Sequence, residues 1–177
     1  MKIKTLFDTK WLSIRKMDVP IPGGTSEYIY SHETRCNGKI VSILPFKRTA
    51  HGPNEYLLRD EFTPCWSTSE NFISSITGGV ENDDAFETAM HELKEESGYI
   101  VTKKDLVALG TCKGIKSSDT TYYLFAVDLT GREKKEITGD GTYFESKSKC
   151  FWGRARDVVK AADPLVSVLY LRLLKNQ

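Results

Sequence analysis

One stretch of 22 residues, Gly78 to Tyr99, constrains the fold more than any other part of the chain: GGVENDDAFETAMHELKEESGY. Its apolar side chains recur at spacings of three and four residues: Phe86, Ala89, Met90 and Leu93. This spacing predicts an α-helix with one buried side. Asp83 or Asp84 can cap its N-terminus, where a carboxylate accepts hydrogen bonds from unpaired backbone N–H groups. Gly98 can end the helix in the left-handed conformation.

The same helix carries three glutamates on one turn, Glu92, Glu95 and Glu96. They share a face because residues three and four positions apart are neighbours on a helix. Like charges at this spacing repel by a few tenths of a kcal/mol each, so the cluster gives an isolated helix no advantage. Mg²⁺ prefers oxygen ligands and is commonly shared between carboxylates and substrate phosphates. The pattern is consistent with a metal site and also with a solvated acidic helix that Lys94 partly neutralises.

Short apolar and β-branched runs elsewhere predict strands, over Trp11–Lys16, Glu27–Ser31, Gly38–Phe46, Glu55–Arg59, Phe72–Ile76, Leu106–Cys112, Thr120–Asp128 and Lys149–Gly153. The first two flank a glycine-rich turn and form a hairpin. A second helix is expected from Pro164 onward, capped by Asp163. Its predicted apolar stripe consists of Leu165, Val168, Leu169 and Leu173. Strands before, between and after two main helices indicate an α/β fold with a mixed sheet between helices.

Composition excludes several classes of protein. The 177 residues suit one ordinary domain, and 25 basic against 24 acidic residues give a net charge of +1. This balance argues against a protein that tracks nucleic acid or an anionic membrane surface. The four cysteines, at positions 36, 65, 112 and 150, show no CxxC spacing, so we expect reduced thiols without zinc or disulfides. With no apolar run near the ~20 residues of a membrane span, we expect a cytoplasmic protein.

The acidic stretch resembles the signature of the Nudix hydrolases. That signature is a glycine, five residues, a glutamate, seven residues, and then an REUxEExGU ending in which U is apolar. The match here runs from Gly78 through Asp83 to His91 and ends at Tyr99, with one residue fewer in the loop. His91 stands where the signature has an arginine, and imidazole titrates near neutral pH, so the substitution predicts pH-sensitive activity. The resemblance implies a Nudix-type α/β/α sandwich that holds Mg²⁺, or Mn²⁺, through Glu92, Glu95 and Glu96.

The likeness extends over most of the chain. The segments TKWLSIRKMDVPIPGGTSEYIY, GKIVSILPF and ITGDGTYFE resemble the branch that hydrolyses ADP-ribose and nucleotide-sugars. It implies an N-terminal β extension over residues 1–37, which would serve as a dimerisation arm, and a Nudix domain over residues 38–177. Thr63 occupies the place of an expected phosphate-binding arginine, and Ser74 the place of a carboxylate that can help to hold metal.

The resemblance also implies roles for individual residues. The reaction would be hydrolysis of the diphosphate bond of a nucleoside diphosphate linked to another group, such as a nucleotide-sugar or ADP-ribose. Glu95 and His91 would act in catalysis beside a general base from the later loop, Glu145, with Asp140 as the second choice. Trp11 and Tyr28 would stack against the nucleobase, although core packing also explains these aromatic residues. The remaining substrate-binding residues would be Gly78, Gly79 and Arg59, and a surface salt bridge is an equal alternative for the arginine.

Two other functions stay open at this point. The changes at His91, Ser74 and Thr63 are compatible with a nucleotide-binding Nudix module that has weak or no turnover. A hydrolase of RNA caps or RNA 5′ ends is less favoured, because proteins that follow a phosphate backbone usually carry a basic stripe. The expected partner is therefore a small nucleotide derivative rather than nucleic acid.

Overall fold

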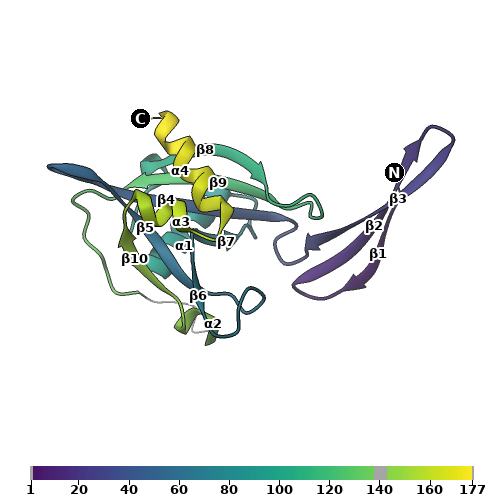
Figure 1. Cartoon of the computed structure of the whole chain (residues 1–177), viewed down its shortest axis with the longest axis horizontal. Helices are drawn as coiled ribbons and strands as arrows, with labels where there is room; N and C mark the ends of the chain where they lie inside the picture. Colours follow the sequence, from purple (N-terminus) through teal and green to yellow (C-terminus); the bar gives the residue numbers. More distant parts are fainter. Residues whose placement is uncertain (1, 138–142, 177) are drawn as a thin grey trace.

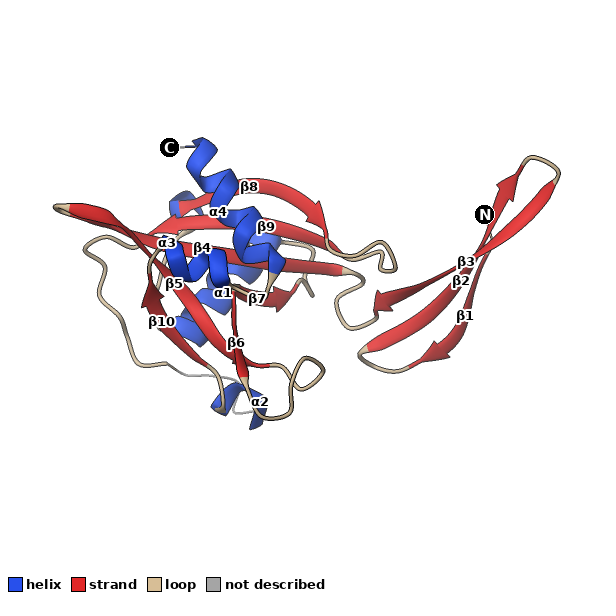
Figure 2. Cartoon of the chain, viewed as in Figure 1, coloured by secondary structure: helices blue, strands red, loops and turns tan. Residues whose placement is uncertain are grey.

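The computed structural model describes residues 2–137 and 143–176. They form two β-sheets, and helices cover the larger one (Figures 1 and 2). In chain order the elements are β1 (Ile3–Asp8), β2 (Leu12–Ile21), β3 (Gly24–Glu33), β4 (Lys39–Thr49), β5 (Gly52–Phe62), β6 (Asn71–Ser74), β7 (Ile76–Gly79), α1 (Ala85–Ser97), the 3₁₀ helix η1 (Lys103–Asp105), β8 (Leu106–Lys113), β9 (Thr121–Asp128), α2 (Tyr143–Ser146), β10 (Lys149–Gly153), α3 (Ala155–Lys160) and α4 (Pro164–Asn176).

The larger sheet is mixed, as predicted. Its strands lie in the order β10-β5-β4-β9-β8, with β6 beside β5 and β7 beside β4. β4 and β9 are parallel, whereas β4 pairs antiparallel with β5 and β7. The predicted strand Phe72–Ile76 is in fact two strands separated at Ser75. The amide and hydroxyl of Ser75 donate to Oδ2 of Asp163 at 3.2 and 2.9 Å, which takes this residue out of the ladder.

Helices cover both faces of this sheet, because side chains alternate along its strands. One face packs against α1 and includes Val41, Ile43, Leu57, Phe125 and Val127. The opposite face packs against α3 and α4 and includes Leu44, Phe46, Leu58, Leu124 and Ala126. Odd-numbered residues of β4, β5 and β9 therefore face α1, and even-numbered residues face α4. The predicted α/β/α layering is confirmed.

Helix α1 begins and ends where the sequence predicts. The carboxylate of Asp84 accepts hydrogen bonds from the amides of Phe86 and Glu87 at 2.8 and 3.2 Å, so Asp84 is the N-cap. Asp83, the other predicted cap, instead has a positive φ of 58° and pairs with Lys39. Gly98 ends the helix with a φ of 76° in the left-handed region.

The C-terminal helix is confirmed as well. Oδ1 of Asp163 accepts a hydrogen bond from the amide of Leu165 at 2.9 Å. Its buried side chains are Leu165, Val166, Leu169 and Leu173, so the stripe includes Val166 in place of the predicted Val168, which is only partly buried. α3 and α2 were not predicted, since six and four residues are too short to show a helical period. Among the described residues, no helix is long and apolar enough to cross a membrane.

The N-terminal sheet, β1-β2-β3, stands beside the main body (Figure 1). The predicted β2–β3 hairpin is present, and β1 adds a third strand that sequence reasoning missed. The pairing of β1 with β2 shifts register between Thr5 and Phe7, and this irregularity removes the simple alternation from the sequence. The sheet meets the body where Ser31 N–H donates to the Ser117 carbonyl at 2.8 Å. The division at residue 37 into two domains stays a prediction.

Candidate active site

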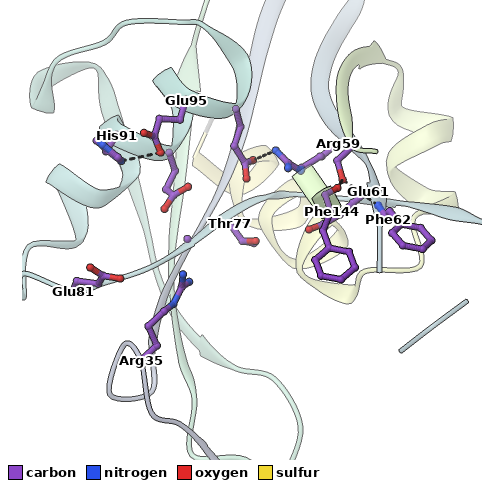
Figure 3. Close-up of a pocket in the computed structure, with 13 residues that line it drawn as sticks. Arg35, Arg59, Glu61, Phe62, Thr77, Glu81, His91, Glu95 and Phe144 are labelled. Carbon is purple, nitrogen blue, oxygen red and sulfur yellow. Dashed lines mark hydrogen bonds and ion pairs between the residues drawn. The ribbon is translucent and has the colours of Figure 1, made fainter. Parts of the chain in front are cut away.

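A cavity of about 410 Å³ opens beside the C-terminal half of α1 (Figure 3). Its lining is strongly charged: Arg35, Arg59, Glu61, Phe62, Thr77, Gly78, Glu81, His91, Glu92, Glu95, Glu96, Phe144 and Ser148. The three predicted metal ligands are thus together on one wall, with His91 beside them. Gly78 and Arg59 are the predicted substrate-binding residues that also reach this cavity.

Two neighbours define the surroundings of Glu95 and Glu92 on α1. Nδ1 of His91 lies 3.3 Å from Oε2 of Glu95, one helical turn away, and the imidazole is otherwise largely exposed. The carboxylate of Glu92 lies directly over Gly78, where a Cβ atom would be only 1.9 Å from Oε1 of Glu92. Gly78 therefore leaves room for a carboxylate at the cavity wall, which is a steric reason for glycine at this position.

Arg59 lies in the protein interior, which corrects one sequence-based alternative for it. Its Nη1 is 2.6 Å from Oε2 of Glu96, and the two side chains are only 7% and 12% exposed. The surface salt bridge considered from the sequence is wrong, because Arg59 has an odd position on β5 and its side chain faces α1. The arginine forms an ion pair with a signature glutamate across the layer between sheet and helix.

Glu61 is a site residue that sequence reasoning missed. It lies two positions after Arg59 on β5, so both side chains belong to the same face of the strand. Its Oε2 accepts a hydrogen bond from the hydroxyl of Ser74 at 2.5 Å. Ser74 is the position at which the resemblance leads one to expect a carboxylate, and the neighbouring strand supplies one at hydrogen-bond distance. The alternation of Leu57, Arg59 and Glu61 along the strand is the sequence pattern that could have placed Glu61 beside Arg59.

Arg35 and Glu81 complete the charged lining from loops, and both were missed for that reason. Figure 3 shows Arg35 reaching toward the cavity from the side opposite His91 and Glu95. The guanidinium carbon of Arg35 lies 5.4 Å from the ring centroid of Trp11, a cation–π distance. Among the described residues, Arg35 forms no ion pair, so its positive charge is available to an anionic ligand.

The structure does not bring the two predicted base-stacking residues together within one chain. Trp11 is about half exposed and does not line the cavity, but its ring contacts Arg35, which does. Tyr28 lines a different cavity of about 400 Å³, and its hydroxyl donates to the Lys116 carbonyl at 2.5 Å. Tyr28 pairs with Met17, six residues beyond Trp11, which is about 20 Å along a strand.

A different aromatic pair lies at the cavity itself. The rings of Phe62 and Phe144 are stacked, with centroids 6.2 Å apart and planes inclined by 23°. Phe144 belongs to α2, the element that also contains Glu145, whose side chain lies outside the part of the structure that is described. Asp140 lies outside the described residues too. Gly79 pairs with Ile40 in the sheet and does not line the cavity.

Cys150 lies beneath the glutamates and is not a candidate nucleophile. Its thiol donates to the carbonyl of Glu96 at 3.4 Å. Burial, reinforced by the nearby Glu96 carboxylate, raises the pKa of Cys150 to about 12. The thiol is therefore neutral at physiological pH, whereas a nucleophile or metal ligand must be a thiolate. All four cysteines are free.

The residues present fit a hard divalent cation that is shared with a ligand. Among the described residues, no group of three or more His, Cys, Asp or Glu side chains could hold a metal ion unaided. Mg²⁺ does not require such a group, because it keeps several waters and is usually held by one or two carboxylates together with substrate phosphates. The lining offers oxygen donors, and Gly78 leaves the space that the Glu92 carboxylate occupies.

Comparison with solved structures identifies the fold. An ADP compounds hydrolase matches 100% of this chain and 94% of its own, with 19% identity and a TM-score of 0.70. A C. elegans Ap4A hydrolase matches 77% of this chain and 98% of its own, with 18% identity and a TM-score of 0.53. The NUDIX domain of Shewanella oneidensis NrtR, complexed with ADP ribose, matches 76% and 87%, with 12% identity and a TM-score of 0.56.

These likenesses show that the chain has the Nudix fold, as the acidic stretch predicted. No protein-family model matches the sequence, and no curated protein sequence does. At identities below 20%, the backbone arrangement is shared while most side chains differ. The chemistry of this cavity therefore has to be argued from its own residues.

Proposed function

We propose that the protein is a divalent-metal-dependent pyrophosphohydrolase that cleaves the diphosphate bond of a nucleoside diphosphate linked to another group. The products would be a nucleoside monophosphate and a phosphorylated second group. The observation that carries the proposal is the cavity itself, where glutamates of α1 face the guanidinium of Arg35, which has no ion-pair partner within the described part of the chain. Compounds of ADP, Ap4A and ADP ribose appear in the names of three proteins with this fold, which favours the same substrate class.

Glu92, Glu95 and Glu96 are the residues that would hold Mg²⁺ or Mn²⁺. Bound there, the cation would offset the negative charge that the diphosphate oxygens carry and develop during hydrolysis. Glu61 and Glu81 face the same cavity and extend the acidic wall. This arrangement favours an anionic substrate that arrives together with a cation, because the carboxylates alone would repel it.

The protein's own cations would position the substrate. Arg35 can form two hydrogen bonds with one phosphate group, which the planar guanidinium allows and an ammonium does not. It would thereby supply the charge that Thr63 lacks. His91 orients Glu95, and Glu145 stays our proposed general base, since its neighbour Phe144 lines the cavity. The exposed face of Phe144, or of Trp11, would stack on the nucleobase.

The direct test is a hydrolysis screen with Mg²⁺ and Mn²⁺ across ADP-ribose, UDP-glucose, NADH, diadenosine polyphosphates and capped RNA. We expect metal-dependent release of a nucleoside monophosphate from at least one of the small diphosphates. Glu95→Gln should keep the fold and lower kcat by at least about 10²-fold, as the loss of a metal-linked group does. Glu133→Gln is the matched control, because this exposed glutamate lies outside the cavity. Activity without metal, or an unchanged Glu95→Gln variant, would reject the proposal.

A second candidate is a nucleotide-binding module with weak or no turnover. His91 stands where the Nudix signature has an arginine, and Thr63 stands where a phosphate-binding arginine is expected; these replacements favour it. Calorimetry separates the two functions. Tight binding of ADP-ribose without hydrolysis in either metal supports the module, and turnover excludes it. Hydrolysis of capped RNA alone would instead favour a hydrolase of RNA caps or RNA 5′ ends.

The N-terminal sheet supports a further proposal, that the protein is a homodimer. All of β1 is exposed, and the sheet presents large apolar side chains to solvent, among them Ile3, Leu6, Phe7, Ile21 and Ile29. A three-stranded sheet needs a second layer over its apolar face, and a second copy of this chain offers one. Light scattering should show a dimer, and removal of residues 1–37 should yield monomers. A full-length monomer at micromolar concentration contradicts this proposal.

The cytoplasmic location also stays a prediction.

A further inference from the structure

Arg59 pairs with a glutamate of the proposed metal site from a different layer of the fold. We infer that Arg59 is a positioning residue, which fixes the Glu96 carboxylate for metal binding from strand β5. The inference rests on the proposed function. It assigns the orientation of Glu96 to a residue of β5, whereas Glu95 is contacted by His91 of α1 itself.

The geometry singles out this pair among the ion pairs of the described residues. Nη1 of Arg59 lies 2.6 Å from Oε2 of Glu96, and both side chains are almost fully buried. The other pairs have at least one partner more than a quarter exposed, so solvent screens them. Solvent screens a short contact between two buried groups much less than an exposed pair, so Arg59 holds the Glu96 carboxylate more firmly than an exposed partner would.

The surroundings explain why Arg59 points at Glu96. On β5, Leu57 packs in the core under α1, and Arg59 is the next residue on the same face. Cys150, opposite Arg59 on β10, donates its thiol to the backbone carbonyl of Glu96. The strand pair β5–β10 therefore holds both the backbone and the side chain of Glu96.

Stability alone does not account for an ion pair at this position. Apolar residues of similar volume are commonly as stabilising as a buried pair, because two charges must lose their water. The pair lies at the wall of the acidic cavity, with Glu92 and Glu95 on the same helix turn. His91 contacts Glu95 and Arg59 contacts Glu96, so two neighbouring carboxylates are oriented by basic groups from two elements.

The test compares three arginines. Arg59→Gln should weaken Mn²⁺ binding, followed by electron paramagnetic resonance without substrate, by at least about 10-fold and lower kcat by about 10²-fold. Arg35→Gln, from the same cavity, should raise KM while Mn²⁺ affinity stays within threefold. Arg172, whose Nη1 donates to the carbonyls of Leu109 and Thr111, is the structural control. Arg172→Gln should lower the unfolding midpoint without changing Mn²⁺ affinity.

Two further variants keep the inference open to refutation. Arg59→Lys retains the charge, so it should fold even if Arg59→Gln does not, and show an intermediate loss of Mn²⁺ affinity. In Glu96→Gln, substitution of Arg59 should cause no additional loss, because the group it positions has been changed. A folded Arg59→Gln or Arg59→Lys variant with wild-type Mn²⁺ affinity and kcat overturns the inference. A wild-type protein that hydrolyses nothing, yet loses Mn²⁺ affinity in Arg59→Gln, rejects the proposed function and keeps the inference.

Discussion

Gly78→Ala is the sharpest probe of the proposed active site. The backbone of Gly78 is not in the left-handed region, so alanine introduces no conformational strain there. The added Cβ would lie 1.9 Å from Oε1, 2.1 Å from Cδ and 2.3 Å from Cγ of Glu92. Since ordinary contacts begin near 3.4 Å, the carboxylate must move by about 3.4 − 1.9 = 1.5 Å. The substitution therefore displaces one proposed metal ligand and changes little else.

The expected effect follows from that displacement. A misplacement of about 1 Å at a catalytic group can cost about 10²-fold in rate, which equals about 2.7 kcal/mol of activation free energy. We expect kcat of Gly78→Ala to fall by about 10²-fold or more in a Mg²⁺-dependent hydrolysis assay. The free energy of unfolding in urea should change by less than about 1 kcal/mol, because the partly exposed Glu92 side chain has room to move.

Two comparisons make this prediction refutable. Gly24→Ala is the matched control, since a Cβ there meets no atom within 4 Å, and it should leave kcat unchanged. In a Glu92→Ala background, Gly78→Ala should cost no further activity, because the clashing side chain is gone. Wild-type kcat in Gly78→Ala, or full additivity of the two substitutions, would refute the reasoning.

The remaining predictions concern the hydrophobic core, the buried thiol of Cys150, and Trp11 beside the cavity. Leu93→Ala, at a fully buried position of α1, should lower the free energy of unfolding in urea by about 3 kcal/mol. Because burial raises the pKa of Cys150 to about 12 from 9.0, its neutral thiol contributes stability that is complete below pH 9 and is lost as pH rises toward 12. Between pH 8 and pH 10.5, the wild-type protein should therefore lose about 2 kcal/mol more than Cys150→Ala in urea titrations, and parallel losses would contradict this. Trp11→Ala, which removes the ring over which Arg35 lies, should raise KM by about threefold and leave kcat unchanged in steady-state kinetics.

The sequence predicted the parts of the fold that depend on local patterns. The spacing of Phe86, Ala89 and Leu93, together with the two caps, was enough to place α1. The single interval Phe72–Ile76 was wrong as one strand because Ser75 binds Asp163, 88 residues away. No short window contains that contact. Distant partners of this kind decide where strands break, and single-sequence reasoning does not detect them.

The same distinction holds for the candidate site. The three glutamates were predictable because they lie on one helical turn, where spacing determines which side chains are neighbours. Arg35 was missed because it lies in the connection between β3 and β4, and its approach to the cavity depends on how the N-terminal sheet meets the body. Phe144 was missed because α2 has only four residues and no detectable period.

Arg59 shows how far a strand pattern can be taken. Alternation along β5 puts Leu57, Arg59 and Glu61 on one face, and the apolar Leu57 indicates that this face is buried. What alternation cannot supply is the offset of α1 across the sheet, which decides whether Arg59 meets Glu96 or another residue. That offset is set by core side chains such as Leu93 packing against several strands at once. If Arg59 does orient Glu96, substitutions in this core that shift α1 should weaken Mn²⁺ binding before they unfold the protein, and Leu93→Val is the variant in which to measure it.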